Sequence, residues 1–212
     1  MTTLLLIRHG ESEANRQKIF AGQINPDLEP EGLLQAKMTA KYIAENYKVD
    51  KIYASDLMRA YKTGLALGEL LKMEVTPDKN LREINGGEWE GKHFCDLPKL
   101  YARDFYMWMS DIGRSRPTNG ESVRELGDRI MTALTKIAEE NDGKTVVIAT
   151  HATPIRAVQS ILQTGGVEGM TNIPFVSNAS VTVLEYDGSW NVVKVGIDEH
   201  LGRLKTALPA NV

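Results

Sequence analysis

Thr3-Leu-Leu-Leu-Ile-Arg-His-Gly-Glu-Ser-Glu-Ala-Asn15 is the stretch around which the rest of the chain is arranged. Its apolar run, residues 4–7, is typical of a buried strand and ends abruptly at Arg8 and His9. Gly10 comes next, a residue that lets the backbone bend sharply or approach a ligand closely. The stretch therefore predicts a strand that delivers a cation and an imidazole to one point of the fold.

Strand-like and helix-like segments alternate along most of the chain. The expected strands are 3–7, 49–54, 75–76, 145–150 and a hairpin of 180–186 with 190–197 around Asp187-Gly188. The expected helices are 11–19, 30–47, 56–71, 122–141 and 153–162, with Ser55 as the N-cap of the third. This order predicts an α/β fold: a three-layer sandwich with a mainly parallel central sheet and helices on both faces. We expect one domain over residues 1–212, with a small inserted cap at about 92–118.

Composition limits the classes of function. The 212 residues are 42% hydrophobic and 25% charged, with a net charge of −3, and no block of like charge indicates a nucleic-acid surface. The longest early apolar run is far too short for a membrane span, and one cysteine, Cys95, excludes an internal disulfide. We expect a cytoplasmic protein with no nucleic-acid partner, no membrane partner, no metal and no cofactor, and a loosely ordered stretch over the last dozen residues. Its oligomeric state stays open between a monomer and a homodimer.

Basic side chains follow three of the expected strands. Arg8 and His9 come after strand 3–7, Arg59 lies in the first turn of the helix after strand 49–54, and His151 follows strand 145–150. Carboxyl ends of parallel strands share one edge of the sheet, where open α/β folds keep their crevice. Helix N-termini at this edge also favour anions. The pattern predicts a phosphate site.

Several blocks of the sequence resemble one known family. They are Leu6-Ile-Arg-His-Gly-Glu-Ser12 with Asn15, Leu28-x-x-x-Gly-x-x-Gln-Ala36, Ser55-Asp-Leu-Met-Arg-Ala60, Leu81-Arg-Glu83 and Thr150-His151. In this order, and over roughly residues 4–160, they resemble the histidine phosphatase superfamily, also called the phosphoglycerate mutase-like family. Trp89-Glu90-Gly91 is similar to its phosphatase branches rather than to its mutases.

The resemblance implies a role for each site residue. His9 would be the nucleophile that becomes phosphorylated, and Glu83 the proton donor. The phosphoryl oxygens would be held by Arg8, Asn15, Arg59 and His151. Apart from the resemblance, Gln23 could also reach a phosphate oxygen. We expect the guanidinium groups to keep the His9 imidazole neutral, and its second ring nitrogen to donate to a backbone carbonyl.

The residues alone leave other interpretations open. Arg59 could pair with Asp56 on its own helix, and His151 could be a buried structural histidine. Asn15 and Gln23 could be turn residues. Tyr101, Phe105 and Trp108 fall at helical spacing and predict the buried face of a cap helix; alternatively they line the substrate entrance, with Arg103, Arg114 or Arg116 supplying charge.

The leading hypothesis is a metal-independent phosphomonoesterase that hydrolyses a small phosphorylated metabolite through a phosphohistidine. The alternatives are a phosphoglycerate mutase and a non-catalytic module that binds a phosphorylated ligand. Phosphosugars, nucleotide precursors and cobalamin-pathway phosphates all stay open as substrates.

Overall fold

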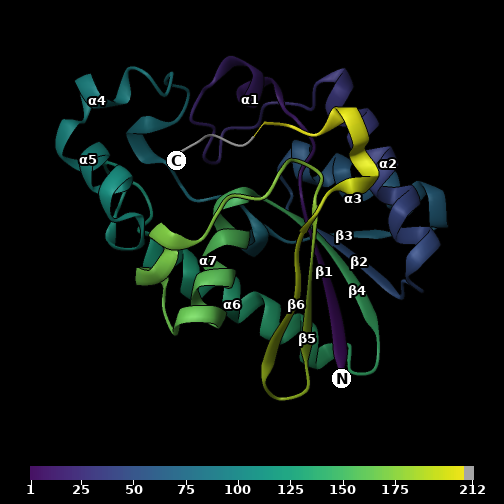
Figure 1. Cartoon of the computed structure of the whole chain (residues 1–212). Coiled ribbons are helices and arrows are strands. Elements are labelled where there is room, and N and C mark those ends of the chain that lie inside the picture. Colours follow the sequence, from purple (N-terminus) through teal and green to yellow (C-terminus); the bar gives the residue numbers. More distant parts are fainter. Residues whose placement is uncertain (208–212) are drawn as a thin grey trace.

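The computed structural model describes residues 1–207 and contains a central six-stranded sheet in the order β3-β2-β4-β1-β5-β6 (Figure 1). Its strands are β1 (Thr2–Arg8), β2 (Lys51–Ala54), β3 (Val75–Pro77), β4 (Thr145–Thr150), β5 (Val181–Tyr186) and β6 (Trp190–Ile197). The pairs β1–β4, β2–β4 and β2–β3 are parallel, whereas β5 pairs antiparallel with both β1 and β6. The mainly parallel sheet and the hairpin at Asp187-Gly188 are therefore confirmed.

Alternation along the buried strands separates the two faces of the sheet. Leu4 and Leu6 of β1 contribute to a core with α6 (Val123–Glu140) and α7 (Ala152–Thr164). Leu5 and Ile7 point to the opposite face, where α2 (Pro30–Asn46) and α3 (Met58–Leu71) cover the sheet. Since side chains in a strand alternate between faces, four consecutive apolar residues produce a strand buried on both sides. The three-layer arrangement expected from the sequence is confirmed (Figure 1).

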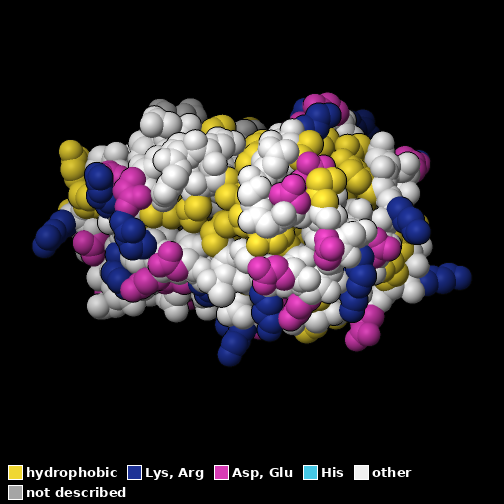
Figure 2. Space-filling model, turned by 90° about the horizontal axis from the view of Figure 1, so that it is seen from below, with side chains coloured by type: hydrophobic (Ala, Val, Ile, Leu, Met, Phe, Trp, Pro, Cys, Tyr) yellow, Lys and Arg dark blue, Asp and Glu magenta, His cyan; other side chains and the backbone are white. Residues whose placement is uncertain are grey.

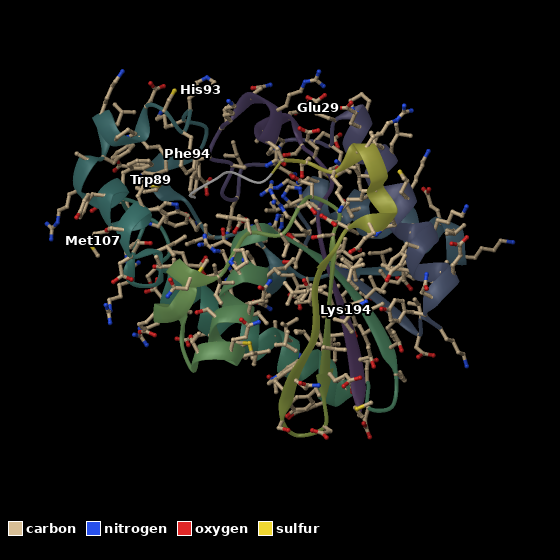
Figure 3. All side chains as sticks on the ribbon, in the orientation of Figure 1. Glu29, Trp89, His93, Phe94, Met107 and Lys194 are labelled. Carbon is tan, nitrogen blue, oxygen red and sulfur yellow. The ribbon has the colours of Figure 1, made fainter. Side chains whose placement is uncertain are left out.

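Residues 92–118, which we call the cap segment, hold the short helices α4 (Leu97–Leu100) and α5 (Ala102–Ser110) at one side of the molecule (Figure 1). Trp108 of α5 is buried in an apolar cluster with Phe20 and Trp89, and Figure 3 shows Trp89 and Phe94 on this side. The expected buried face of a cap helix is confirmed at Trp108, while Tyr101 and Phe105 are only partly buried. Arg103, Arg114 and Arg116 line a separate surface hollow outside this cluster.

Three boundaries differ from the expectations. The first helix is shorter, α1 (Glu13–Gln17), and α3 begins at Met58 with Leu57 as its N-cap, so the N-cap role of Ser55 was wrong. The tail is more regular than expected, because Glu199–Leu204 forms 3₁₀ turns with Leu201 buried. Residues 208–212 of that tail lie outside the described residues.

The surface mixes charges of both signs. On the face shown in Figure 2, Lys and Arg side chains are interspersed with Asp and Glu. No helix within residues 1–207 is long and apolar enough to cross a membrane.

Candidate active site

The strand register brings both candidate histidines to one edge of the sheet. Arg8 at the end of β1 pairs with Thr150 at the end of β4, so His9 and His151 leave the sheet side by side. Their ring centroids lie 5.2 Å apart. Both are almost fully buried, with exposed fractions of 4% and 0%. Parallel neighbours in the sheet therefore create the crevice expected at their carboxyl ends.

A backbone carbonyl group fixes the tautomer of His9. Its Nδ1 lies 2.7 Å from the carbonyl oxygen of Gly10. Because a carbonyl only accepts hydrogen bonds, Nδ1 carries the proton and Nε2 keeps its lone pair. Burial, and then the charges of Arg59 and Arg8, hold the pKa of His9 well below its usual value. The expected backbone partner of His9 is confirmed, and the lowered pKa favours the expected neutral imidazole.

Arg8 and Arg59 are anchored by backbone carbonyl groups. A terminal nitrogen of Arg8 donates to the carbonyl oxygen of Val176 at 2.6 Å, and Arg59 donates to those of Gly22 (2.8 Å) and Ile24 (3.0 Å). Burial lowers the pKa of each guanidinium to about 10, so both remain charged at neutral pH. Within residues 1–207 neither forms an ion pair with a carboxylate, and their charge is available to a bound anion.

Asp56, the alternative partner considered for Arg59, pairs instead with Arg82 through two contacts of 2.6 Å. This removes the helix-internal ion pair as an explanation for Arg59.

Asn15 lines the cavity, and its side-chain oxygen is already used by donors within the protein. That oxygen accepts from the backbone nitrogen and hydroxyl of Ser12 (3.1 and 2.9 Å) and from Nδ2 of Asn178 (3.3 Å). Asn178 also donates to the carbonyl oxygen of His9 at 3.0 Å. Asn178 was missed by sequence reasoning, since it lies in a loop before β5 with no motif to mark it.

The His151 ring is oriented by Ser55, the residue that was expected to be the N-cap of α3. Its Nε2 lies 2.8 Å from the hydroxyl of Ser55, while its buried Nδ1 has no hydrogen-bond partner within the described part of the chain. Burial, followed by the charge of Arg59 and of His9, lowers the pKa of His151 well below its usual value. Ser55 follows β2 at the same edge of the sheet, which places its hydroxyl within reach of His151. The same hydroxyl accepts from the backbone nitrogen of Leu57, the N-cap residue of α3, at 3.3 Å.

Glu83 faces the cavity from the loop after β3. Its carboxylate accepts from the backbone nitrogens of Ile84 (2.8 Å) and Thr153 (3.3 Å), and the second of these belongs to the first turn of α7. The side chain is partly buried, as expected. Gln23 does not reach the lining of the cavity: its amide nitrogen donates to the carbonyl oxygen of Glu83 at 3.1 Å. This contact links Gln23 to the loop of Glu83, and its phosphate contact stays a prediction.

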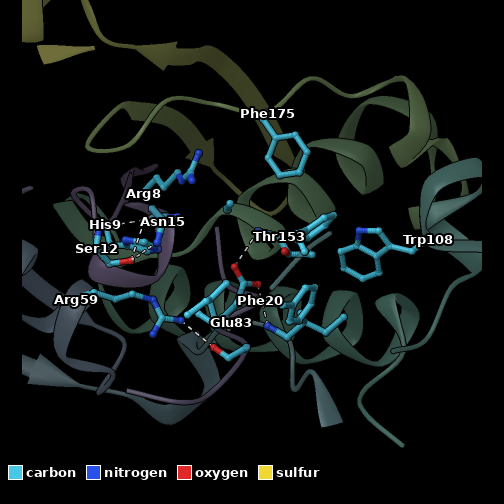
Figure 4. A pocket seen from close by; sticks show the side chains of 16 residues that line it. Arg8, His9, Ser12, Asn15, Phe20, Arg59, Glu83, Trp108, Thr153 and Phe175 are labelled. Carbon is cyan, nitrogen blue, oxygen red and sulfur yellow. Dashed lines mark hydrogen bonds between the residues drawn. The ribbon is translucent and has the colours of Figure 1, made fainter. Parts of the chain in front are cut away.

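One cavity of about 160 Å³ is lined by Arg8, His9, Asn15, Arg59 and Glu83 and has two chemically different halves (Figure 4). His151, which lies beside His9, is not among its lining residues. The polar half holds Arg8, His9, Ser12, Asn15, Arg59 and Glu83. The apolar half holds Ile19, Phe20, Ala21, Ile84, Phe94, Trp108 and Phe175. Figure 4 shows Trp108 and Phe175 across the cavity from Arg8 and His9.

Comparison with known proteins agrees with this geometry. The pattern of the histidine phosphatase superfamily (branch 1) matches residues 4–198. Phosphoserine phosphatase 1 of Hydrogenobacter thermophilus is 32% identical over 204 residues, covering 95% of each chain.

Two solved structures are similar over nearly the whole chain. YhfR of Bacillus stearothermophilus has a TM-score of 0.90 at 27% identity, covering 95% of this chain and 100% of its own. A mutant phosphoserine phosphatase from Entamoeba histolytica, in complex with phosphoserine, has a TM-score of 0.84 at 26% identity with the same coverage. With buried histidines and unpaired arginines at one sheet edge, and a family match over most of its length, this chain belongs to the histidine phosphatase superfamily.

Proposed function

We propose that this protein is a metal-independent phosphoric monoester hydrolase that acts on a small phosphorylated metabolite through a phosphohistidine. The observation that carries the proposal is the state of His9, a neutral imidazole with a free Nε2 between two arginines that no carboxylate of the described residues neutralises. Phosphoryl transfer needs positioning and charge stabilisation more than covalent assistance, and this arrangement supplies both.

In the first step Nε2 of His9 attacks phosphorus, and the bond from phosphorus to the ester oxygen breaks. Arg8, Asn15, Arg59 and His151 hold the phosphoryl oxygens, and protonated Glu83 gives its proton to the leaving alcohol. In the second step water attacks the phosphohistidine. Glu83 takes a proton from this water, the bond from phosphorus to nitrogen breaks, and inorganic phosphate leaves.

In this proposal the cap segment forms part of the active site. It supplies Phe94 and Trp108 to the cavity, so it covers the end at which the leaving group lies. A single domain with this inserted cap, and a cytoplasmic location, stay predictions.

The test is to compare the wild type with His9→Ala on p-nitrophenyl phosphate, with and without a chelator. We expect activity that withstands the chelator and falls by at least about 10³-fold in the variant, since the covalent route is then closed. Rapid quenching of the wild type should trap an acid-labile, alkali-stable phosphoenzyme that His9→Ala does not form. Full activity of the variant would exclude His9 as the nucleophile.

A mutase would behave differently with 3-phosphoglycerate. Formation of 2-phosphoglycerate would support an isomerase, whereas release of free phosphate supports the hydrolase. A phosphoenzyme that forms once and never turns over would instead identify a binding module.

A further inference from the structure

The apolar half of the cavity, opposite the arginines, faces the group that leaves with the ester oxygen. Its side chains come from the loop after α1, the loop after β3, the cap segment and the loop before β5. Phe20 and Trp108 pack edge to face, with ring centroids 5.6 Å apart. A leaving group bound in this half therefore meets aromatic surface.

The ring of Phe175 is held in place by Arg156. The guanidinium of Arg156 lies 4.3 Å from the centre of this ring. Arg156 also donates to the carbonyl oxygens of Ile173 (2.5 Å) and Met170 (3.0 Å), which fixes the loop that carries Phe175. An aromatic wall that is already ordered loses little entropy when it binds a ligand.

Charged substituents on the leaving group would find no counter-charge in this half among residues 1–207. Among the residues that line the cavity, only Arg8, His9 and Arg59 can be cationic, and all three belong to the polar half. The backbone N–H groups of Ile19 and Phe20 are already used, by the carbonyl oxygens of Ala14 and Lys92, both at 2.9 Å. A carboxylate here would lose part of its hydration without a counter-charge.

An ammonium group would be equally disfavoured. Within residues 1–207, Glu83 is the single acidic side chain in the lining, and the proposed reaction needs its carboxyl group for proton transfer to the leaving oxygen. An ammonium group bound to the carboxylate oxygens of Glu83 would compete with this proton transfer.

We propose that the preferred substrates are phosphate monoesters of uncharged, apolar alcohols, aromatic ones above all, and that phosphoserine is a poor substrate. The proposal rests on the phosphatase function given above. By this proposal the chain differs from its phosphoserine phosphatase relatives in the alcohol part of the preferred substrate. The phosphate group would be bound in the same way.

The experiment compares kcat/KM for three monoesters of primary alcohols: 2-phenylethyl phosphate, ethyl phosphate and O-phospho-L-serine. Burying a phenyl ring should favour 2-phenylethyl phosphate over ethyl phosphate by about tenfold or more. Phosphoserine should fall below ethyl phosphate. The electron-withdrawing ammonium makes serine a better leaving group than ethanol. Chemical reactivity alone would therefore favour phosphoserine over ethyl phosphate, which is opposite to the result that the proposal predicts.

A variant tests whether the preference for the phenyl ester arises in the cavity. Phe175→Ala should lower kcat/KM for 2-phenylethyl phosphate several-fold more than for ethyl phosphate, because only the first ester contacts the ring. Tyr106→Ala is the matched control, since Tyr106 is an aromatic residue of α5 that is 70% exposed and does not line the cavity. It should leave the ratio between the two esters unchanged.

The experiment distinguishes failure of the substrate preference from failure of the phosphatase function. Phosphoserine hydrolysed faster than both alkyl esters, or an unchanged ester ratio in Phe175→Ala, would overturn the apolar preference and leave the phosphatase intact. If none of the three esters releases phosphate and no phosphohistidine forms, the proposed function itself fails.

Discussion

At the scale of single residues, the charge state of His9 depends on its two arginine neighbours. Burial disfavours the imidazolium, and the positive charges of Arg59 and Arg8 disfavour it further. A basic group with a lowered pKa stays neutral to lower pH, so His9 should remain a competent nucleophile in mildly acidic solution.

Replacing one of these arginines should raise the pKa of His9 toward its usual value of about 6.5. We expect Arg59→Gln to move the protonation midpoint of His9 to higher pH, because one of two repelling charges is gone. Long-range ¹H–¹⁵N NMR spectra of the free protein, recorded from pH 7.5 to 5, would measure this midpoint directly. A midpoint that stays in place or moves to lower pH would contradict the electrostatic argument.

At the scale of elements, the loop that carries Glu83 is clamped by α6. Arg129 of α6 makes two contacts of 2.8 Å with the carboxylate of Glu121. The same guanidinium donates to the carbonyl oxygens of Asn80 (2.7 Å), Arg82 (3.0 Å) and Glu83 (3.3 Å). Only a planar, forked cation can satisfy partners in so many directions, which makes Arg129 a positioning residue for the proton donor.

Arg129→Lys should therefore loosen the Glu83 loop while keeping the charge. We expect kcat to fall by about tenfold with a smaller change in KM, since proton transfer depends on the placement of Glu83. Steady-state kinetics of the variant would show this split. Arg124→Lys is the control, because Arg124 lies on the same helix, is 68% exposed and pairs with Glu168 away from the loop. Equal effects of the two substitutions would argue against a specific clamp.

At the scale of the whole molecule, buried histidines link stability to pH. The pKa values of His9, His151 and His200 are all lowered in the folded protein, chiefly by burial. The unfolded chain then binds more protons once the pH drops below about 6.5, the usual histidine pKa. Protonation thus stabilises the unfolded state, and the free energy of unfolding should fall as the pH is lowered from 6.5.

Urea unfolding at pH 7.5, 6.5 and 5.5 would measure this loss, which is at most about 1.4 kcal/mol per pH unit for each histidine. His151→Gln should give a shallower pH dependence than the wild type whatever its absolute stability, because one linked group is removed. An identical slope in both proteins would show that His151 is not linked to folding.

Most of the fold was predictable because its signals are local. The apolar run of β1, the periodicity of the helices and the turn at Asp187-Gly188 depend on neighbouring residues alone, and these elements appear close to the expected residues, apart from the shorter α1 and the later start of α3. The position of basic side chains after successive strands was local as well. Because parallel packing brings such positions to one edge, the meeting of His9, Arg59 and His151 could be expected from the order of the strands.

Gly10 shows where local reasoning was incomplete. The sequence suggested a sharp bend or a ligand contact, but a Cβ atom at Gly10 would lie 2.4 Å from the carbonyl oxygen of Gly32. The glycine is required by the start of α2, a segment more than twenty residues away. No sequence periodicity reports such an approach between two stretches of backbone.

The sequence by itself determined the elements, the sheet class and the residues at the strand ends, because hydrophobic periodicity and strand direction already specify them. Only the tertiary structure decided that Ser55 contacts His151, that Asn178 holds the loop of His9, and that Gln23 donates to the backbone of Glu83. These contacts join residues 60 to 169 positions apart. Their geometry follows from strand order and loop packing, which depend on the whole core and not on any one segment.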